Sequence, residues 1–234
     1  MHYQLAAWLL TAFLAWVPQY HTDMPRYADA KETHEEQEAR FSEIANALAT
    51  VVLDPEERSL FSGKWGREKT ATQMAAIAYY ESHLARNVDY GLGKWGRGDY
   101  GGSWCLMQIN LGRGRDGDSA DRTPEGWSGK DLVADREKCF RAGLHKLRQS
   151  WGCGKGAEKL TVYASGRCIT GTPETDKDRH VLAAAWYRYT WATRNWDERR
   201  VALVAAYRSA EMELLAQDPA AQVVGPEPSA LLAP

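Results

Sequence analysis

The chain lacks the features that mark nucleic-acid and metal-binding proteins. Its 29 Lys and Arg residues nearly balance 31 Asp and Glu residues, and the net charge of −2 provides no strongly basic surface. The four cysteines are spaced too widely for a C-x-x-C zinc site, and no histidine cluster accompanies them. The sequence also has no internal repeat and no alternating apolar pattern long enough for a large sheet. We expect a mainly α-helical domain with no metal, no cofactor and no nucleic-acid partner.

Positive charge is also missing near the N-terminus. The apolar run from Leu5 to Val17 is too short to span a bilayer as a helix. It resembles the hydrophobic region of a secretory signal, but no Lys or Arg precedes it and no cleavage site is evident. We expect residues 1–20 to be a signal-like segment, or a helix that docks on a membrane or another protein outside the folded core. We therefore expect the protein to be exported to the periplasm or cell envelope.

Helical periodicity divides the rest of the chain into a linker, one domain and a tail. Residues 21–35 are polar and charged, which is typical of a linker. Apolar residues then recur at helical spacing in residues 41–52, 74–85 and 131–151, and a short helix is expected at 157–163. Two further helices are predicted at 176–194 and 197–217, so the domain covers residues 36–217. Residues 218–234 are rich in Ala and Pro and are expected to be a disordered tail.

The cysteines occur in even number, at positions 105, 139, 153 and 168. In a chain that we expect to be exported, this favours two disulfides over buried free thiols. We predict Cys105–Cys139 and Cys153–Cys168, because the second pair brackets one short segment. Each bridge would stabilise the fold by about 3–4 kcal/mol through loop closure, less any strain.

One glutamate falls on an apolar helix face. Residues 70–86 carry apolar side chains at helical spacing, and Glu81 lies seven residues after Met74 on the same stripe. A carboxyl group against apolar neighbours is costly to ionise, so it would stay protonated near neutral pH. A protonated glutamate is the usual proton donor for breaking a glycosidic bond. The alternative is a glutamate at the edge of the stripe that pairs with an arginine.

The segment after this helix is rich in glycine. Residues 87–104 contain glycine at six positions and no continuous apolar face, which predicts a loop or an irregular hairpin. Gly91, Gly93 and Gly96 match G-x-G-x-x-G. That match follows a helix rather than a strand, so it does not predict a dinucleotide site.

Three short segments occur in order around this loop: Glu81-Ser82, then Cys105-Leu106-Met107-Gln108, then Tyr163-Ala164-Ser165-Gly166. They resemble the motifs of the lysozyme-like lytic transglycosylases, relatives of goose-type lysozyme, which carry Glu-Ser, Gly-Leu-Met-Gln and Tyr-Asn-Ala-Gly. Residues 131–151 also resemble the family's helix between the last two motifs. The resemblance covers about residues 40–195. Cys105 departs from the motif's glycine, and Ala164-Ser165 departs from Asn-Ala.

The resemblance implies a lysozyme-like fold with a small β part and a glycan cleft beside the catalytic helix. It makes Glu81 the catalytic acid and base. Met107 would shape the cleft, and Gln108 would offer its amide to the substrate or to the Glu81 loop. Tyr163 would bring its hydroxyl near the glutamate or the sugar. Ser103 is the candidate contact for the substrate's N-acetyl group.

The implied substrate is peptidoglycan, cut at the β-1,4 bond between N-acetylmuramic acid and N-acetylglucosamine. Glu81 would protonate the bridging oxygen and then deprotonate the muramoyl C6 hydroxyl, which closes a 1,6-anhydro ring. A hydrolase would need a second carboxylate, and Asp89 and Asp99 in the glycine-rich loop are the candidates. A third alternative is a non-catalytic module that binds peptidoglycan within an envelope-penetrating, phage-like or injection machine.

Overall fold

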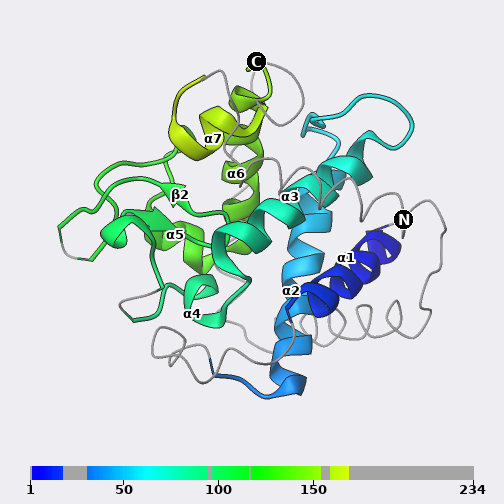
Figure 1. Ribbon diagram of the computed structural model, residues 1–234, viewed down its shortest axis with the longest axis horizontal. Helices are drawn as coiled ribbons and strands as arrows, with labels where there is room; N and C mark the ends of the chain where they lie inside the picture. The colour runs from blue at the N-terminus through cyan, green and yellow to red at the C-terminus, as the bar shows by residue number, and fades with distance from the viewer. Residues whose placement is uncertain (1, 18–30, 94–95, 116, 154–158, 169–234) are drawn as a thin grey trace, which may run out of the picture.

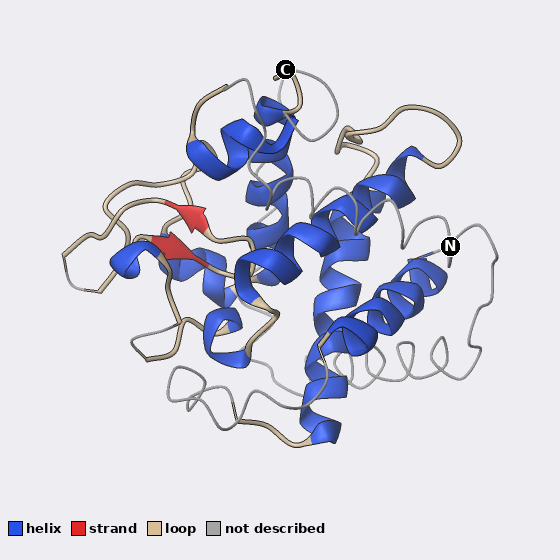
Figure 2. Ribbon diagram, viewed as in Figure 1, coloured by secondary structure: helices blue, strands red, loops and turns tan. Residues whose placement is uncertain are grey.

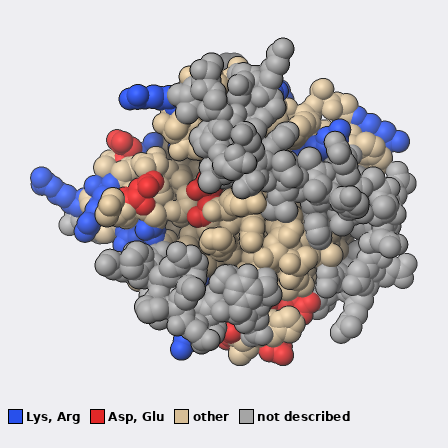
Figure 3. Space-filling view, in the orientation of Figure 1, with Lys and Arg blue, Asp and Glu red and all other residues tan. Residues whose placement is uncertain are grey.

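The computed structural model describes residues 2–17, 31–93, 96–115, 117–153 and 159–168, which are mainly helical as expected (Figure 1, Figure 2). The elements are α1 (His2–Trp16), α2 (His34–Leu53), α3 (Gly66–Ser82), α4 (Arg86–Asp89), η3 (Asp99–Gly101), β1 (Ser103–Trp104), β2 (Ile109–Asn110), α5 (Gly129–Ala134), α6 (Arg136–Ser150) and α7 (Thr161–Ser165). The helices predicted at 176–194 and 197–217, the tail and most of the linker lie outside the described residues. Charges of both signs are scattered over the face in Figure 3.

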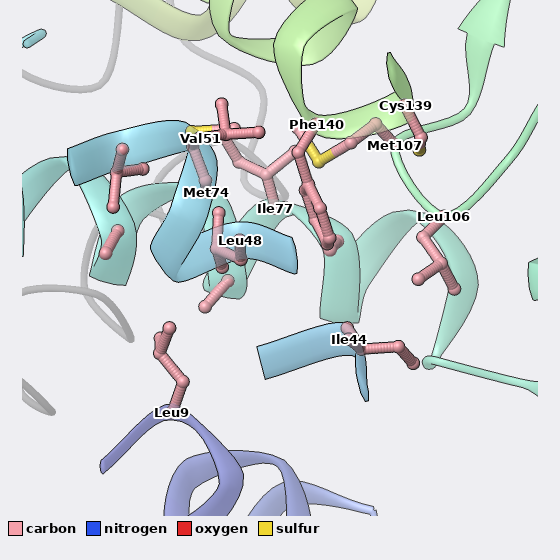
Figure 4. Close-up of a cluster of buried hydrophobic side chains, with 14 of the residues drawn as sticks. Leu9, Ile44, Leu48, Val51, Met74, Ile77, Leu106, Met107, Cys139 and Phe140 are labelled. Carbon is pink, nitrogen blue, oxygen red and sulfur yellow. The ribbon is translucent and has the colours of Figure 1, made fainter. Parts of the chain in front are cut away.

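Helices α2, α3 and α6 pack around one apolar core (Figure 4). Their fully buried side chains there include Ile44, Leu48, Met74, Ile77 and Phe140. Burying one such side chain contributes about 1.5–3 kcal/mol, so this core supplies much of the stability. Helix α2 begins after a capping box in which the side chains of Thr33 and Glu36 bond each other's backbone N–H.

The helix predicted at 131–151 is two helices, α5 and α6, that meet at Asp135. Asp135 is extended, with φ −140°, and its side chain accepts hydrogen bonds from the Glu137 and Lys138 N–H groups. It therefore caps the N-terminus of α6. Strands β1 and β2 form a two-stranded antiparallel sheet, in which Ser103 pairs with Asn110 and Trp104 with Ile109.

Helix α1 packs into the core, which corrects the expectation that the segment from Leu5 to Val17 lies outside it. Leu5, Leu9 and Phe13 are fully buried, and Leu9 faces the α2–α3 cluster in Figure 4. The Phe13 ring meets the Phe41 ring of α2 edge-on, with 6.0 Å between centroids. A helix that is apolar on nearly all sides must be covered, and α2 and α3 cover it here. Of the helices described, none has the length and apolar character needed to cross a membrane.

The side of α6 that faces away from the apolar core contacts the loop that follows α2. Glu57 of this loop is buried. Its Oε1 lies 2.7 Å from Arg141 Nη1, and its Oε2 lies 2.6 Å from Arg148 Nη1. His145 Nε2 lies 3.1 Å from the same carboxylate. Burial raises the pKa of Glu57, but the bonds from these three side chains outweigh it and hold the pKa below its ordinary value. The loop is therefore fastened to α6 by a charged network.

Replacing Phe13 tests the placement of α1. We expect Phe13→Ala to lower the free energy of unfolding by about 3–5 kcal/mol, because it leaves a cavity against α2. Tyr3→Ala, on the same helix but with Tyr3 43% exposed, should cost about 1 kcal/mol or less. Urea denaturation followed by circular dichroism measures both. Equal, small losses would show that α1 does not belong to the core.

Candidate active site

Glu81 lies in the last turn of α3 and is half-buried. The helix ends at Ser82, whose Oγ accepts a hydrogen bond from the Leu84 N–H at 3.1 Å. His83 and Leu84 both have a φ of 51°, in the left-handed region, and turn the chain away. The helical stripe predicted to continue through residue 85 therefore stops at residue 82, and Glu81 stands at the end of the helix rather than within it.

Left-handed backbone is concentrated after Glu81. In the described chain, the non-glycine residues with positive φ all lie between residues 83 and 108: His83, Leu84, Asp99, Tyr100, Cys105 and Gln108. Such conformations cost an L residue about 1–3 kcal/mol, so the surrounding contacts must hold them. Strain of this kind clusters at functional sites. The segment that follows Glu81 is therefore the first place to look for one.

Both predicted disulfides are present and both anchor this part of the molecule. Cys105 is bonded to Cys139 of α6, with 6.1 Å between Cα atoms. Cys153, just after α6, is bonded to Cys168, just after α7, with 5.6 Å between Cα atoms. The first bridge ties the loop before Met107 to α6. The second closes the segment that carries α7.

One stripe of α6 receives the two loops that the disulfides anchor. Besides Cys139, it contains Gly143, where an added Cβ would lie 2.7 Å from Met107 Cε. Further along it, Ser150 Oγ accepts a hydrogen bond from the Tyr163 N–H at 3.1 Å. Residues 139, 143 and 150 are separated by four and seven positions, which places them on one helix face. The second and third motifs are therefore held against the same face of α6.

Met107 and Tyr163 support the site from within the protein. The Met107 side chain is fully buried, against Gly143 of α6. The Tyr163 hydroxyl donates its hydrogen bond to the Met107 carbonyl, and the ring is only 7% exposed. The two residues thus join the second motif to the third. Their role in this structure is to fix the positions of the loops.

Gln108 and Ser103 are also engaged within the protein. Gln108 Oε1 accepts a hydrogen bond from the Gly98 N–H at 3.0 Å, and Nε2 donates to the Cys105 carbonyl at 2.9 Å. Gly98 is required there, because a Cβ would lie 2.2 Å from Gln108 Oε1. Ser103 is buried, and its Oγ donates to Asp99 Oδ2. These hydrogen bonds brace the glycine-rich loop.

Two charged side chains lie beside predicted site residues: Asp99 is bonded to Ser103, and Lys146 lies near the Tyr163 ring. Asp99 is exposed and accepts a second hydrogen bond from Asn110 Nδ2 at 3.1 Å. Lys146 is half-buried on α6, with its Nζ 5.8 Å from the centre of the Tyr163 ring. Burial lowers the pKa of Lys146, and the charges of Glu81 and Asp99 partly raise it again. The ammonium is therefore within electrostatic reach of both carboxyl groups.

The sequence does not single out Lys146, since a lysine in a helical pattern is usually solvated. Its spacing identifies it only once the contacts of Gly143 with Met107 and of Ser150 with Tyr163 are known. Lys146 lies three residues after Gly143 and four before Ser150. Tyr100 is equally inconspicuous in the sequence. It follows Asp99 with a φ of 55° and is 97% exposed, so its ring is available for contact with a ligand.

Asp89 is a structural residue, which removes one of the two candidates for a second carboxylate. It is 2% exposed and receives Arg136 Nη2 at 2.8 Å and Nε at 3.0 Å. Arg40 Nη1 lies 3.4 Å away on the other side. Burial lowers the pKa of Arg136, but Asp89 outweighs it and leaves that pKa above its ordinary value. The three side chains join α2, α4 and α6.

Two other features that could hold a ligand are a metal-binding cluster and a surface hollow. Within the described ranges, no three His, Cys, Asp or Glu side chains are grouped as a metal site would require. An open hollow of about 920 Å³ is lined by residues 55–68, and Glu81 is not among its lining residues. Met107, Gln108 and Tyr163 are likewise not among the residues that line this hollow.

Comparison with protein-family models, with curated proteins and with solved structures finds no match to this chain. Function must therefore be inferred from the residues and their geometry.

Replacing Gly143 tests the contact between α6 and the Met107 loop. A methyl group there would overlap Met107, which costs about 1–3 kcal/mol, against a helix-propensity gain of at most about 1 kcal/mol. We expect Gly143→Ala to lower the free energy of unfolding by about 1–2 kcal/mol. Gly152→Ala, where nothing lies within 4 Å of the added Cβ, is the matched control and should be nearly neutral. Increased stability of Gly143→Ala in urea denaturation would contradict the close contact.

Proposed function

We propose that this protein is a peptidoglycan-cleaving lytic transglycosylase with a lysozyme-like fold, in which Glu81 is the acid and base. One observation carries the proposal. Glu81 ends α3 directly before the left-handed turn at His83 and Leu84. The segments of the second and third motifs are bonded to each other through Met107 and Tyr163 and lie on one face of α6. A carboxyl group beside a strained loop is a feature typical of a glycosidase active site. The substrate, peptidoglycan, is proposed because the three sequence motifs resemble those of the lytic transglycosylases.

In the proposed reaction, a protonated Glu81 gives its proton to the bridging oxygen of the glycan. The bond from that oxygen to the muramoyl C1 breaks, and positive charge develops on the sugar ring. Glu81, now a carboxylate, takes the proton of the muramoyl C6 hydroxyl as its oxygen bonds to C1. The products are a 1,6-anhydro end and a free hydroxyl on the departing sugar. Glu81 ends protonated, ready for the next cycle, and no cofactor takes part.

The glycine-rich loop that follows Glu81 offers groups that suit a sugar ligand. Tyr100 presents an almost fully exposed ring, and flat aromatic faces stack on sugar rings. Asp99 beside it offers carboxylate oxygens to sugar hydroxyls. The two disulfides support an oxidising location such as the periplasm or cell envelope, where peptidoglycan is found.

A second candidate is a muramidase that hydrolyses the same bond. Asp99 favours it, because this exposed carboxylate is held in place by Ser103 and Asn110. Asp99→Asn separates the two functions. A hydrolase that uses Asp99 should lose at least about 100-fold in rate, whereas ring closure by the C6 hydroxyl should continue.

Glu81→Gln tests the proposed function directly. The amide cannot donate a proton to the glycan, so turbidity loss of purified peptidoglycan should fall by at least about 1,000-fold. Sedimentation of the variant with peptidoglycan should be unchanged, because the side-chain shape is retained. Equal clearing by the variant and the wild type would remove Glu81 from the mechanism. A wild type that sediments with peptidoglycan and never clears it would identify a binding module instead.

A further inference from the structure

We propose that the hollow formed by the loop between α2 and α3 is a second glycan-binding site, in which the Glu68 carboxylate accepts hydrogen bonds from the hydroxyl groups of an uncharged sugar. The choice of a glycan rests on the proposed function, whereas the hollow lies apart from Glu81. It is lined by residues 55–68, and its volume of about 920 Å³ is in the range of ligand pockets, roughly 300–1,000 Å³.

Glu68 and Glu81 lie at opposite ends of α3. Glu68 is in the first turn of this helix and Glu81 is in the last. Their positions are about 20 Å apart along the helix axis, at 1.5 Å for each residue. Figure 1 shows the loop between α2 and α3, coloured cyan, at the end of α3 that is far from α4. The hollow is therefore separate from the candidate active site.

Glu68 is a buried acceptor without a donor. Its side chain is 4% exposed, and it is among the residues that line the hollow. Its backbone carbonyl accepts a hydrogen bond from Thr72 Oγ1 at 2.8 Å, but within the described residues no hydrogen bond or ion pair reaches its carboxylate. An unpaired buried carboxylate is costly, and the positive end of the α3 dipole offsets only part of the cost. A ligand that donates hydrogen bonds would supply the missing partners.

Two aromatic side chains line the same hollow. Phe61 and Trp65 are both half-buried there. The Phe61 ring meets the Trp151 ring edge-on, with 5.0 Å between centroids, which fixes its orientation. Lys64 Nζ lies 5.0 Å from the centroid of the Trp65 ring. Aromatic faces stack on sugar rings, while a carboxylate accepts hydrogen bonds from the sugar hydroxyls. The hollow combines both groups.

The charges of the lining favour an uncharged ligand. The ionisable residues of the lining are equally divided between acidic and basic types: Glu56, Glu57, Glu68, Arg58, Lys64 and Arg67. Electrostatic complementarity with such a lining requires a ligand without net charge. A sugar meets this condition and still provides hydroxyl donors for Glu68.

The loop is fastened at both ends, so the hollow is preformed. Arg67 Nη1 donates hydrogen bonds to the Val52 and Asp54 carbonyls, at 2.6 Å each. From α6, Arg148 Nε donates to the Arg58 carbonyl at 2.7 Å. Binding therefore requires little additional ordering of the chain, which favours affinity.

The test measures sugar binding by the full chain with Glu81→Gln, so that cleavage does not interfere. The probe is the tetramer of N-acetylglucosamine, an uncharged saccharide, and the readout is the backbone amide NMR signals of residues 55–68. Into this protein we would introduce Glu68→Gln, Trp65→Leu or Trp65→Phe, with Glu35→Gln as the matched control. Glu35 also lies in the first turn of a helix, but it is exposed and does not line the hollow.

The signals of residues 55–68 should shift when the tetramer is added. Glu68→Gln should raise the dissociation constant measured at these signals by about 10-fold, because hydrogen bonds to a charged acceptor are lost. Trp65→Leu should raise it by roughly 3- to 10-fold, and Trp65→Phe, which retains an aromatic face, by less. Glu35→Gln should change nothing. The thermal melting curve of Glu68→Gln should also be unchanged, because no bond within the described chain is lost, and this separates a binding role from a structural one.

Absence of a shift at residues 55–68, or an unchanged dissociation constant in Glu68→Gln, would overturn the inference. Tighter binding of the deacetylated tetramer, which carries positively charged amino groups, would overturn the choice of an uncharged sugar. If Glu68→Gln does not fold, the comparison of Trp65→Leu with Trp65→Phe decides, and equal binding by these two variants would contradict the site.

The NMR titration needs no turnover, so its outcome is independent of the proposed reaction. A wild type that never clears peptidoglycan, together with the expected shifts, would disprove the reaction and retain the binding site. Clearing of peptidoglycan without any shift at residues 55–68 would disprove the binding site alone.

Discussion

Met107 can lie directly against α6 only because residue 143 has no side chain. A Cβ at that position would come within 3.2 Å of the Met107 Cβ and closer still to its Cγ and Cε. The Cys105–Cys139 bridge fixes the same loop one turn of α6 earlier. Ser150 and the second bridge fix the Tyr163 segment at the other end of the helix. The left-handed residues between 83 and 108 are held in a frame that α6 provides.

This frame separates residues that build the site from those available for chemistry. Four predicted site residues make their contacts inside the protein. The polar groups of Gln108, Tyr163 and Ser103 form internal hydrogen bonds, and the Met107 side chain is buried. Glu81, Asp99 and Lys146 carry the charges, and Tyr100 contributes an exposed surface. Of the groups available for chemistry, the motifs contain Glu81, whereas Asp99, Tyr100 and Lys146 come from outside them.

The even number and the spacing of the cysteines predicted both disulfide pairs. Local periodicity was sufficient to predict the mainly helical class and the existence of α2 and α6. It could not place the end of α3, because the left-handed turn at His83 and Leu84 depends on burial of Leu84 by distant parts of the chain. It could not place α1 either. An apolar helix satisfies the same pattern whether a membrane, a partner or its own domain covers it. Lys146 escaped prediction for a related reason, since the tertiary fold brings the Tyr163 ring to it.

The chemical nature of the cleaved ends is the most direct measure of the account. Purified peptidoglycan would be digested with the wild-type protein, and the released muropeptides identified by mass spectrometry without chemical reduction. The proposed proton donation by Glu81 and attack by the C6 hydroxyl predict fragments that end in 1,6-anhydromuramic acid. Fragments that end only in reducing N-acetylmuramic acid would contradict ring closure and indicate hydrolysis. The absence of any soluble fragment would contradict catalysis altogether.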